Sequence, residues 1–393
     1  MSAQPDSTAV RPAPRRSTLG APPRLLSVAT ALPRHIASQS AARSLAARMF
    51  EEGLDPEDRR LIGVFDSSGI ETRYFCMPLE WYAQVRTFGE MNARYLEHAL
   101  ELAAEAAARA LARAGLTPAD VDHVVFVSST GLATPSVDAR LANVLSFRSD
   151  VRRTPIWGLG CAGGAAGLAR ARDFTLADPS AHVLLIALEL CSLTFQRRDL
   201  DRRSLVAAAL FADGAAAAVI AGADAHASGA NGSGNGAGAD HGTDAGARGF
   251  ELLASRSMLW RDTLDVMGWD VDQHGLHVIF SRDIPTIVRE WVRPNLDSFL
   301  AANGTSLERL THLIAHPGGP KVLAAYGEAL GLPPEAFRHA REVLRECGNM
   351  SSPTCLFVLE RALAAGDIRP GDSAVLAALG PGFSSELVLM RGV

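Results

Sequence analysis

The sequence predicts a layered α/β fold, because short apolar runs alternate along the chain with segments of helical periodicity. In the first half, residues 124–128, 183–187 and 216–220 are short, mainly apolar runs, which are typical of buried strands. Residues 95–114 are rich in alanine and run too far for a strand, so they predict a long helix.

The second half repeats this scheme. Residues 313–315 form an apolar run that leads to His316, and residues 374–377 and 386–390 predict two further strands. We therefore expect two similar halves, residues 24–222 and 250–393.

Two segments lack the composition of a packed core. Residues 223–249 are rich in Gly, Ala, Asn, Ser and Asp, so we expect a flexible surface loop between the halves. Residues 1–23 are rich in Pro, Arg, Ser and Ala and lack the apolar stretch of a signal peptide, so we expect a disordered tail.

Composition narrows the class of protein. With 393 residues and 48% hydrophobic side chains, the chain is long enough to bury a large core. Its 38 basic and 43 acidic residues give a net charge of −5, which argues against a nucleic-acid partner. No apolar run approaches the roughly 18 residues that a transmembrane helix needs. The five cysteines are scattered without a CxxC pair, so we expect no disulfide framework, no zinc site and a cytoplasmic location.

Cys161 lies in a segment rich in glycine and alanine, residues 158–167. A helix that begins right after it would point free N–H groups and its positive dipole end at the sulfur, which favours the thiolate. An imidazole within hydrogen-bond reach would take the thiol proton and give an ion pair that is nucleophilic at neutral pH. Taken alone, such a cysteine also fits the role of a small buried hydrophobic residue.

Two further polar residues lie beside glycines downstream: His316 precedes Pro-Gly-Gly, and Asn349 follows Gly348. An imidazole and an amide suit an enolate or oxyanion that forms next to a thioester carbonyl. Each residue alone also fits a hydrogen-bonded turn or core position. Because all three residues stand at junctions beside glycines, where a substrate can approach closely, the set indicates acyl transfer on a cysteine.

From about Arg24 to Val393 the chain resembles the type III polyketide synthases, the chalcone and stilbene synthase-like enzymes of the thiolase superfamily. The segments that carry the resemblance are residues 160–164 (Gly-Cys-Ala-Gly-Gly), 210–214 (Leu-Phe-Ala-Asp-Gly), 315–320 (Ala-His-Pro-Gly-Gly-Pro), 348–352 (Gly-Asn-Met-Ser-Ser) and 380–383 (Gly-Pro-Gly-Phe). The resemblance implies a thiolase fold of five layers, αβαβα, in which Cys161 from the first half meets His316 and Asn349 from the second.

The resemblance also implies the reaction. A starter acyl group passes from acyl-CoA to Cys161, malonyl-CoA loses carbon dioxide, and His316 and Asn349 stabilise the enolate that extends the chain, without a metal or another cofactor. The step repeats, and the chain cyclises in the same cavity. Two alternatives stay open: a single-condensation enzyme similar to ketoacyl synthase III, which the Pro-Gly-Gly after His316 disfavours, and a non-catalytic scaffold, which the intact set of three residues disfavours.

The resemblance extends to the cavity. Phe211 matches one of the family's two gatekeeping phenylalanines between the CoA tunnel and the cavity, whereas Val278 stands at the second, so that gate has lost its ring. Phe280 is near enough to compensate. The other matching positions, each of which also fits ordinary core filling, are Ser129, Thr130, Cys191, Thr194 and Ser351.

The starter is indicated by two segments. Residues 259–270, which include Trp269, and residues 189–195 resemble the bacterial alkylresorcinol and alkylpyrone synthases, which take long-chain fatty acyl-CoA. We therefore expect an apolar tunnel with Thr130 and Cys191 in its walls, where each buried methylene contributes about 0.8 kcal/mol. A different starter, the number of extensions and the choice between resorcinol and pyrone stay open.

The phosphates of CoA need cations near the tunnel mouth. Arg60 matches one basic position of the family, but Gly63 and Ser67 stand where two others would be. Lys321, which follows the turn containing Gly318 and Gly319, is a second candidate, and the alternative for it is a solvated surface lysine.

The family is dimeric, with a Met that crosses into the cavity of the neighbouring subunit. Thr134 occupies that position here. We therefore expect a homodimer in which the partner contributes less to the cavity.

Overall fold

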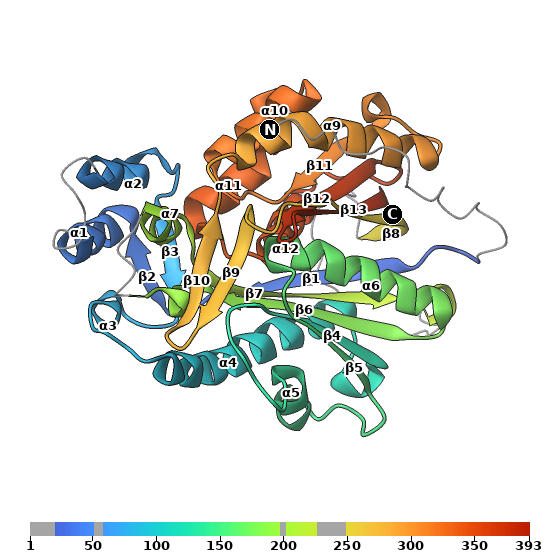
Figure 1. Ribbon diagram of the computed structural model, residues 1–393. Coiled ribbons are helices and arrows are strands. Elements are labelled where there is room, and N and C mark those ends of the chain that lie inside the picture. Colours follow the sequence, from blue (N-terminus) through green and yellow to red (C-terminus); the bar gives the residue numbers. More distant parts are fainter. Residues whose placement is uncertain (1–19, 51–57, 197–201, 226–248) are drawn as a thin grey trace.

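The computed structural model describes residues 20–50, 58–196, 202–225 and 249–393 (Figure 1). The expected tail, residues 1–23, and the expected loop, residues 223–249, fall almost entirely outside the described residues. Both therefore stay expectations.

Within the described residues, a nine-stranded sheet forms the framework, in the order β11-β12-β13-β8-β1-β7-β6-β4-β5. Strands β1 and β8 are joined by only two residue pairs, Arg24 with Glu251 and Leu25 with Phe250, so the sheet divides there into a part from each half of the chain. The N-terminal part contains β1 (Arg24–Ala31), β4 (His123–Val127), β5 (Arg152–Ile156), β6 (His182–Leu190) and β7 (Asp213–Ala221). The C-terminal part contains β8 (Phe250–Leu259), β11 (His312–Ala315), β12 (Ser373–Gly380) and β13 (Ser384–Gly392).

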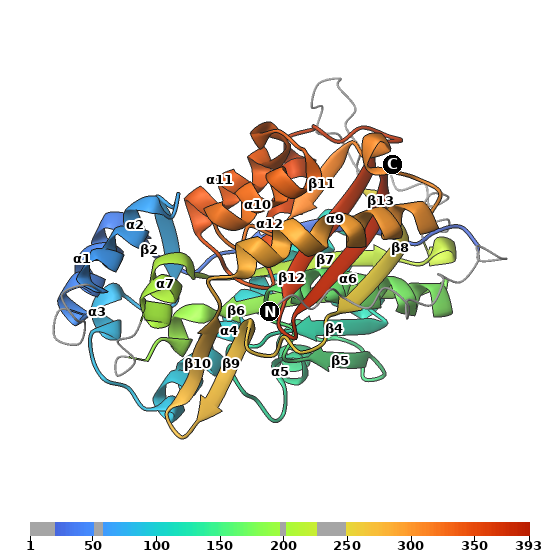
Figure 2. The same ribbon diagram turned by 45° about the horizontal axis from the view of Figure 1, so that its top comes forward.

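Helices complete five layers (Figures 1 and 2). Helix α4 (Phe88–Ala114) packs on the outer face of the N-terminal part, where it contacts β1, β6 and β7. Helices α6 (Gly163–Ala177) and α12 (Thr354–Ala364) lie between the two parts and contact strands of both. The other outer layer contains α9 (Ile284–Ala302), α10 (Pro320–Leu330) and α11 (Arg338–Cys347). The expected αβαβα architecture is confirmed.

The long helix α4 shows how the sequence sets these elements. It begins after Thr87, whose side chain and that of Glu90 form a capping box, and it ends at Gly115 with a left-handed φ of 69°. The alanines of its inner face, among them Ala99, Ala103 and Ala106, are fully buried, because their small side chains let the helix pack closely on the sheet.

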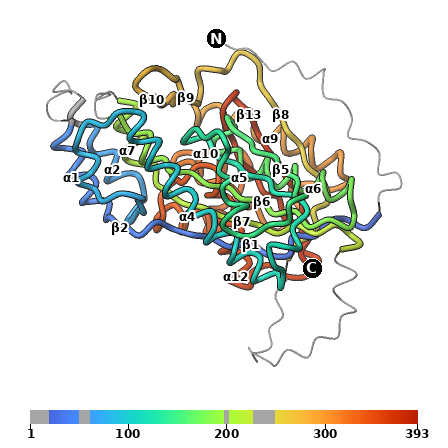
Figure 3. The backbone as a smooth tube through the Cα atoms, turned by 90° about the horizontal axis from the view of Figure 1, so that it is seen from below, coloured from blue at the N-terminus to red at the C-terminus, as the bar shows by residue number. Residues whose placement is uncertain are grey.

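A smaller group of elements lies at one end of the molecule in all three views (Figures 1, 2 and 3). It contains β2 (His35–Ser38), α1 (Gln39–Phe50), α2 (Val64–Ser67), β3 (Thr72–Phe75), α3 (Leu79–Tyr82), α7 (Arg202–Leu210) and the hairpin of β9 (Met267–Asp272) and β10 (Gly275–Phe280). The remaining helix, α5 (Val137–Leu145), packs beside β4 and β5. The strands expected from the apolar runs are all present, whereas the β9–β10 hairpin was not expected.

Candidate active site

Cys161, His316 and Asn349 meet at one small cavity, whose lining also includes Phe280, Tyr326 and Leu379. Cys161 lies in the short turn η4 (Gly160–Ala162), His316 directly follows β11, and Asn349 lies two residues after the end of α11. The structure therefore brings together three residues that are far apart in the sequence.

The glycine run after Cys161 allows the close packing that places it. Helix α6 begins at Gly163, two residues after the cysteine, as the sequence predicts for a helix start. A Cβ on Gly164 would lie 2.2 Å from the backbone oxygen of Ser352, so only glycine permits this approach of α6 to the segment that carries Asn349.

The Cys161 thiol is 6% exposed and donates a hydrogen bond to Ser351 Oγ, at 3.4 Å between sulfur and oxygen. Burial raises the pKa of Cys161 to about 11. Ser351 has a left-handed φ of 59°, a conformation that is costly for serine and that aims its hydroxyl at the sulfur. Ser351 was expected in the cavity lining; it lies beside the cysteine itself and is not among the residues that line the three cavities described here.

His316 is anchored through its backbone, since its N–H donates to the carbonyl of Ala377 at 2.8 Å. Neither ring nitrogen has a hydrogen-bond partner among the described residues, although the side chain is buried. Burial lowers the pKa of His316 to about 3. His316 lines the cavity with the hydrogen-bonding capacity of its ring unused.

The expected thiolate–imidazolium ion pair would need a contact between Cys161 and His316, and no hydrogen bond joins these two side chains in the structure. The sulfur bonds Ser351 rather than His316, and burial disfavours the charged form of both groups. Charging two desolvated groups costs more than their attraction returns when no hydrogen bond joins them. Burial therefore favours a neutral thiol beside a neutral imidazole in this structure.

The Asn349 side chain is fixed by its neighbours. Its Oδ1 accepts from the backbone N–H of Ser351 at 2.8 Å, and its Nδ2 donates to the carbonyl of Gly318 at 3.2 Å. Because Oδ1 accepts and one N–H of Nδ2 donates to Gly318, the second N–H is the remaining donor of an amide that lines the cavity together with His316.

Glu189 is a buried acidic residue at the site that the sequence analysis missed. One carboxylate oxygen accepts from the backbone N–H of Ser129 and from Thr130 Oγ1, each at 2.8 Å, and the other accepts from Ser352 Oγ at 2.9 Å. Burial raises its pKa to about 7. The signal in the sequence that could have found Glu189 is an acidic residue at the end of an apolar run, two positions before Cys191.

Ser129 and Thr130 were expected in the cavity lining, and they are not among the residues that line the three cavities described here. Ser129 Oγ accepts from the backbone N–H groups of Gly158 and Gly160, and Thr130 Oγ1 is used by Glu189 and by the N–H of Leu190. Their hydroxyls support the loop of Cys161, because buried hydroxyls need partners within the protein.

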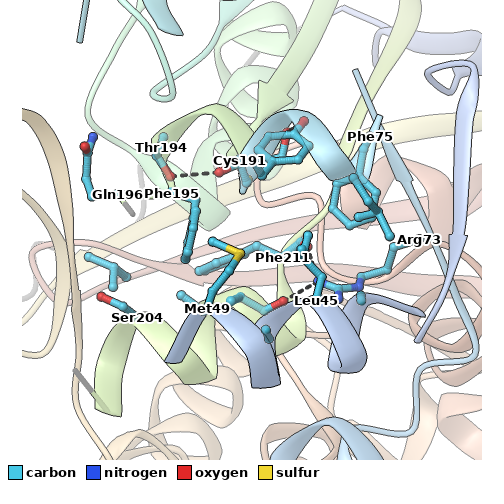
Figure 4. A pocket seen from close by; sticks show the side chains of 18 of the residues that line it. Leu45, Met49, Arg73, Phe75, Cys191, Thr194, Phe195, Gln196, Ser204 and Phe211 are labelled. Carbon is cyan, nitrogen blue, oxygen red and sulfur yellow. Dashed lines mark hydrogen bonds between the residues drawn. The ribbon is translucent and has the colours of Figure 1, made fainter. Parts of the chain in front are cut away.

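A second cavity, which we call the apolar chamber, lies among α1, α7, the turn η5 (Cys191–Thr194) and the β9–β10 hairpin (Figure 4). Leu45 and Met49 of α1 line one side of it, and Phe75 and Phe195 line others. The expected cavity residues found in this lining are Cys191, Thr194, Phe211, Trp269 and Val278. Trp269 and Val278 are cross-strand partners in the hairpin.

Phe211 stands between the chamber and the cavity of Cys161. Its backbone forms a parallel bridge with Asn349, and its ring meets that of Phe280 edge-on, with centroids 6.4 Å apart. Since Phe211 lines the chamber and Phe280 lines the cavity of Cys161, this aromatic pair separates the two spaces. Val278 carries no ring at the second gating position, and Phe280 supplies a ring close to it.

Sequence and structure comparisons agree on the family. Residues 13–225 match the N-terminal domain of chalcone and stilbene synthases, and residues 251–393 match the C-terminal domain of the same enzymes. The chain is 40% identical over 370 residues to a putative chalcone synthase of Bacillus subtilis (strain 168), covering 93% of this chain and 97% of the relative. It is 42% identical over 367 residues to the 1,3,6,8-tetrahydroxynaphthalene synthase of Streptomyces peucetius subsp. caesius, covering 93% and 92%. The chain belongs to the chalcone and stilbene synthase family.

A solved structure extends this result. The 1,3,6,8-tetrahydroxynaphthalene synthase of Streptomyces coelicolor A3(2), a bacterial type III polyketide synthase, matches with a TM-score of 0.84 and 31% identity, over 94% of this chain and 99% of that one. As a type III polyketide synthase, the enzyme is an acyltransferase that condenses malonyl-CoA iteratively onto an acyl-CoA starter. The expectation of an alkylresorcinol or alkylpyrone synthase is more specific than this result. The relatives named here are a putative chalcone synthase and tetrahydroxynaphthalene synthases, so that expectation stays a prediction.

A long groove adjoins both spaces, since Val278 also lines the chamber and Phe280 also lines the cavity of Cys161. Gly318, Gly319 and Lys321 line it, as do Arg202, Arg203 and Arg282, which the sequence analysis did not single out. Arg60 lies in η2 (Asp58–Gly63), a turn that borders the groove through Leu61, but its own side chain is outside the described structure. Thr134 is exposed on the loop between β4 and α5 and lines none of the described cavities.

Groups of three or more His, Cys, Asp or Glu side chains placed to hold a metal ion are absent from the described residues. None of the helices formed by those residues combines the length and the apolar character that a bilayer crossing needs.

Proposed function

We propose that Cys161 carries the growing chain and that His316 and Asn349 serve the enolate. The observation that carries this assignment is the small cavity at which a thiol, an imidazole with both nitrogens free and an anchored amide converge. Because the thiol rests neutral, His316 accepts its proton when an acyl-CoA thioester arrives, and the sulfur then displaces CoA.

Extension follows from the same geometry. Malonyl-CoA loses carbon dioxide, and the electron pair left on carbon is delocalised onto the thioester oxygen, which N–H donors of His316 and Asn349 stabilise. The enolate carbon then attacks the Cys161 thioester, the carbon–sulfur bond breaks, and the lengthened chain leaves on CoA. Reloading onto Cys161 displaces that CoA and permits another round. We propose that no cofactor takes part.

The test of this assignment is Cys161→Ala. We expect the variant to form no polyketide, because no thiol remains to hold the chain, while slow decarboxylation of malonyl-CoA survives on His316 and Asn349. Product analysis by mass spectrometry decides the point. Full-length polyketide from the variant contradicts the assignment.

For the starter, we propose a long-chain fatty acyl group, with an alkylresorcinol or alkylpyrone as product. The apolar chamber supports this proposal, because side chains such as Leu45, Met49 and Phe195 offer a hydrocarbon surface beyond the gate. Each methylene buried there contributes about 0.8 kcal/mol, so a chamber that accepts ten methylenes gives a strong preference for long chains.

A second candidate is a shorter starter that leads to a polyhydroxylated aromatic product. The similarity to two tetrahydroxynaphthalene synthases favours it, as does the presence of Arg73, Tyr82 and Gln196 in the lining of the chamber. Incubation with a panel of acyl-CoAs and labelled malonyl-CoA distinguishes the two. The long-chain proposal fails when products incorporate label alone and fatty acyl-CoAs stay unused.

We propose that the groove holds CoA, with its phosphates near Lys321 and the arginines of α7. Both candidates from the sequence, Arg60 and Lys321, belong to segments that border this groove. Charge reversal of Lys321 to Glu is expected to raise the KM for acyl-CoA and for malonyl-CoA together, since both carry the same phosphates.

We also propose a cytoplasmic homodimer without a nucleic-acid partner. Leu132, Val144 and Trp157 are 43%, 53% and 49% exposed on segments next to Thr134 and the edge strand β5, and large apolar side chains gathered at a sheet edge favour self-association. All five cysteines are free and buried, as suits a reducing compartment. Light scattering of the purified chain tests the dimer.

A further inference from the structure

Arg73 of β3 is a buried arginine that lies against the gate. Its side chain is 1% exposed, and its Nη1 donates to the carbonyl of Ala208 at 2.6 Å and to that of Phe211 at 2.9 Å. The guanidinium carbon lies 5.2 Å from the ring centroid of Phe75 and 5.7 Å from that of Phe65. The charged group is thus wedged between aromatic rings and the chain segment that carries the gating ring (Figure 4).

The stem of the same side chain touches the segment that carries Asn349. A Cβ placed on Gly348 would lie 2.9 Å from Arg73 Cγ, and Gly348 has a left-handed φ of 74°, so glycine is needed here on both counts. Any side chain at this position would push Asn349 and Arg73 apart.

The two segments that Arg73 contacts are also bonded to each other. The N–H of Asn349 donates to the carbonyl of Leu210, and the N–H of Ala212 donates to the carbonyl of Asn349, both at 2.9 Å. Residues 210–212 and residues 348–349 are therefore joined to each other, and Arg73 contacts both segments.

Burial of the guanidinium has an unfavourable desolvation free energy. Within the described residues the guanidinium has no ion pair, and its Nε has no hydrogen-bond partner. Asp213 lies near enough to act on it electrostatically, but that carboxylate is used by Cys76 and Ser192. Burial accordingly lowers the pKa of Arg73 to about 9. An apolar side chain would fill the same space without this cost, so what arginine adds is its pair of directed N–H bonds.

We propose that Arg73 is a positioning residue that locks the gate segment, residues 210–212, to residues 348–349 and thereby sets where the Asn349 amide meets the enolate. The inference rests on the proposed role of Asn349. Arg73 also lines the apolar chamber, but both of its printed hydrogen bonds go to backbone carbonyls of residues 208 and 211, so its proposed influence on decarboxylation passes through Asn349.

The test compares Arg73→Met with a matched control, Arg172→Met. Arg172 of α6 is partly buried. Like Arg73, it donates to two backbone carbonyls, those of Leu252 and Leu253, which lie away from the site. Three quantities are measured: release of carbon dioxide from malonyl-CoA, acylation of Cys161 by a starter acyl-CoA, and the melting temperature.

We expect Arg73→Met to slow carbon dioxide release by about tenfold to a hundredfold, because small displacements of a catalytic group have effects of this size. Acylation of Cys161, which does not use the Asn349 amide, should stay within about twofold of the wild type by the same reasoning. Arg73→Lys, which keeps a donor, should recover part of the loss. Arg172→Met should lower the melting temperature and should not slow carbon dioxide release more than acylation of Cys161.

A double variant separates positioning from general damage. If Arg73 acts through Asn349, Arg73→Met added to Asn349→Ala slows carbon dioxide release no further. Additive losses, or equal losses of both rates in Arg73→Met, overturn the inference. If Asn349→Ala releases carbon dioxide at the wild-type rate, the proposed role of Asn349 is wrong and this inference fails with it. If Asn349→Ala releases carbon dioxide slowly but Arg73→Met releases it at the wild-type rate, this inference alone is wrong. If Arg73→Met fails to fold, Arg73→Lys and Arg73→Gln supply the same comparison.

Discussion

The chemistry of single residues at this site is governed by burial. Cys161 and His316 are both enclosed, and each is kept in its neutral form, since the pKa of the thiol is raised and that of the imidazole is lowered. Under the proposed mechanism, activation needs the substrate, because its thioester gives the unpartnered nitrogens of His316 a group to bond. This arrangement protects a reactive sulfur until it is used.

The low pKa of His316 has a consequence for stability. Its folded value of about 3 is below the usual 6.5, so its contribution to stability is complete above about pH 6.5 and is lost as the pH falls from there toward 3. Between pH 7 and pH 5 we expect the wild type to lose about 2 kcal/mol more stability than His316→Gln, at 1.36 kcal/mol per pKa unit. Urea denaturation at the two pH values checks this. Parallel losses in the two proteins would show that His316 is not buried neutral.

The two donors are expected to differ in their roles. His316→Ala should impair both loading of Cys161 and extension, because the imidazole serves the thiol and the enolate. Asn349→Ala should damage decarboxylation more than acylation. Removal of one donor to a developing oxyanion costs roughly 3 kcal/mol, or about a hundredfold in rate. Single-turnover acylation measured beside carbon dioxide release tests the division, and wild-type acylation in His316→Ala counts against it.

At the scale of elements, the position of the apolar chamber changes which residues are expected to sense the starter. Thr130 was expected in the wall of the tunnel, but its hydroxyl is used by Glu189 and Leu190 within the loop of Cys161. The chamber instead extends from η5 toward α1.

Cys191→Phe is therefore expected to discriminate against long starters. The added ring fills space inside the chamber, and overfilling a packed site typically costs about 1–3 kcal/mol, whereas a short acyl-CoA does not reach that far. Val278→Phe, between the chamber and the groove, should slow all bulky starters without moving the length optimum. Thr130→Val is a second control and should leave the chain-length profile unchanged. Competition assays with acyl-CoA mixtures measure the profile, and an unaltered one in Cys191→Phe would place the acyl chain elsewhere.

At the scale of the whole molecule, the site exists only while the two halves stay packed. Cys161 comes from the first half, and His316 and Asn349 come from the second. The direct strand connection between the halves is short, two residue pairs, so α6 and α12, which contact strands of both parts, carry most of the junction.

We expect the enzyme to unfold in one cooperative transition, because exposing either face of α6 or α12 would uncover the core of both halves. Calorimetry should show a single unfolding peak, and activity should be lost over the same range of temperature. Two resolved transitions, with one half melting first, would mean that the central helices do not couple the halves.

The sequence by itself determined the class of fold and the chemistry. Apolar runs such as residues 183–187 predict strands, because a short run without polar residues on either face suits a strand that is covered on both sides. The glycines around Cys161, His316 and Asn349 also mark these residues locally, since they allow close approach of backbone and substrate.

Only the tertiary structure decided the protonation of the site and the roles of its surroundings. Whether Cys161 is a thiol or a thiolate depends on desolvation by residues from distant segments, which no local pattern records. The same holds for Glu189, for Thr130 and for Arg73, because a polar side chain in a sequence does not reveal which backbone groups it will bond after folding. The partners of buried polar groups are set by packing, and packing is a property of the whole chain.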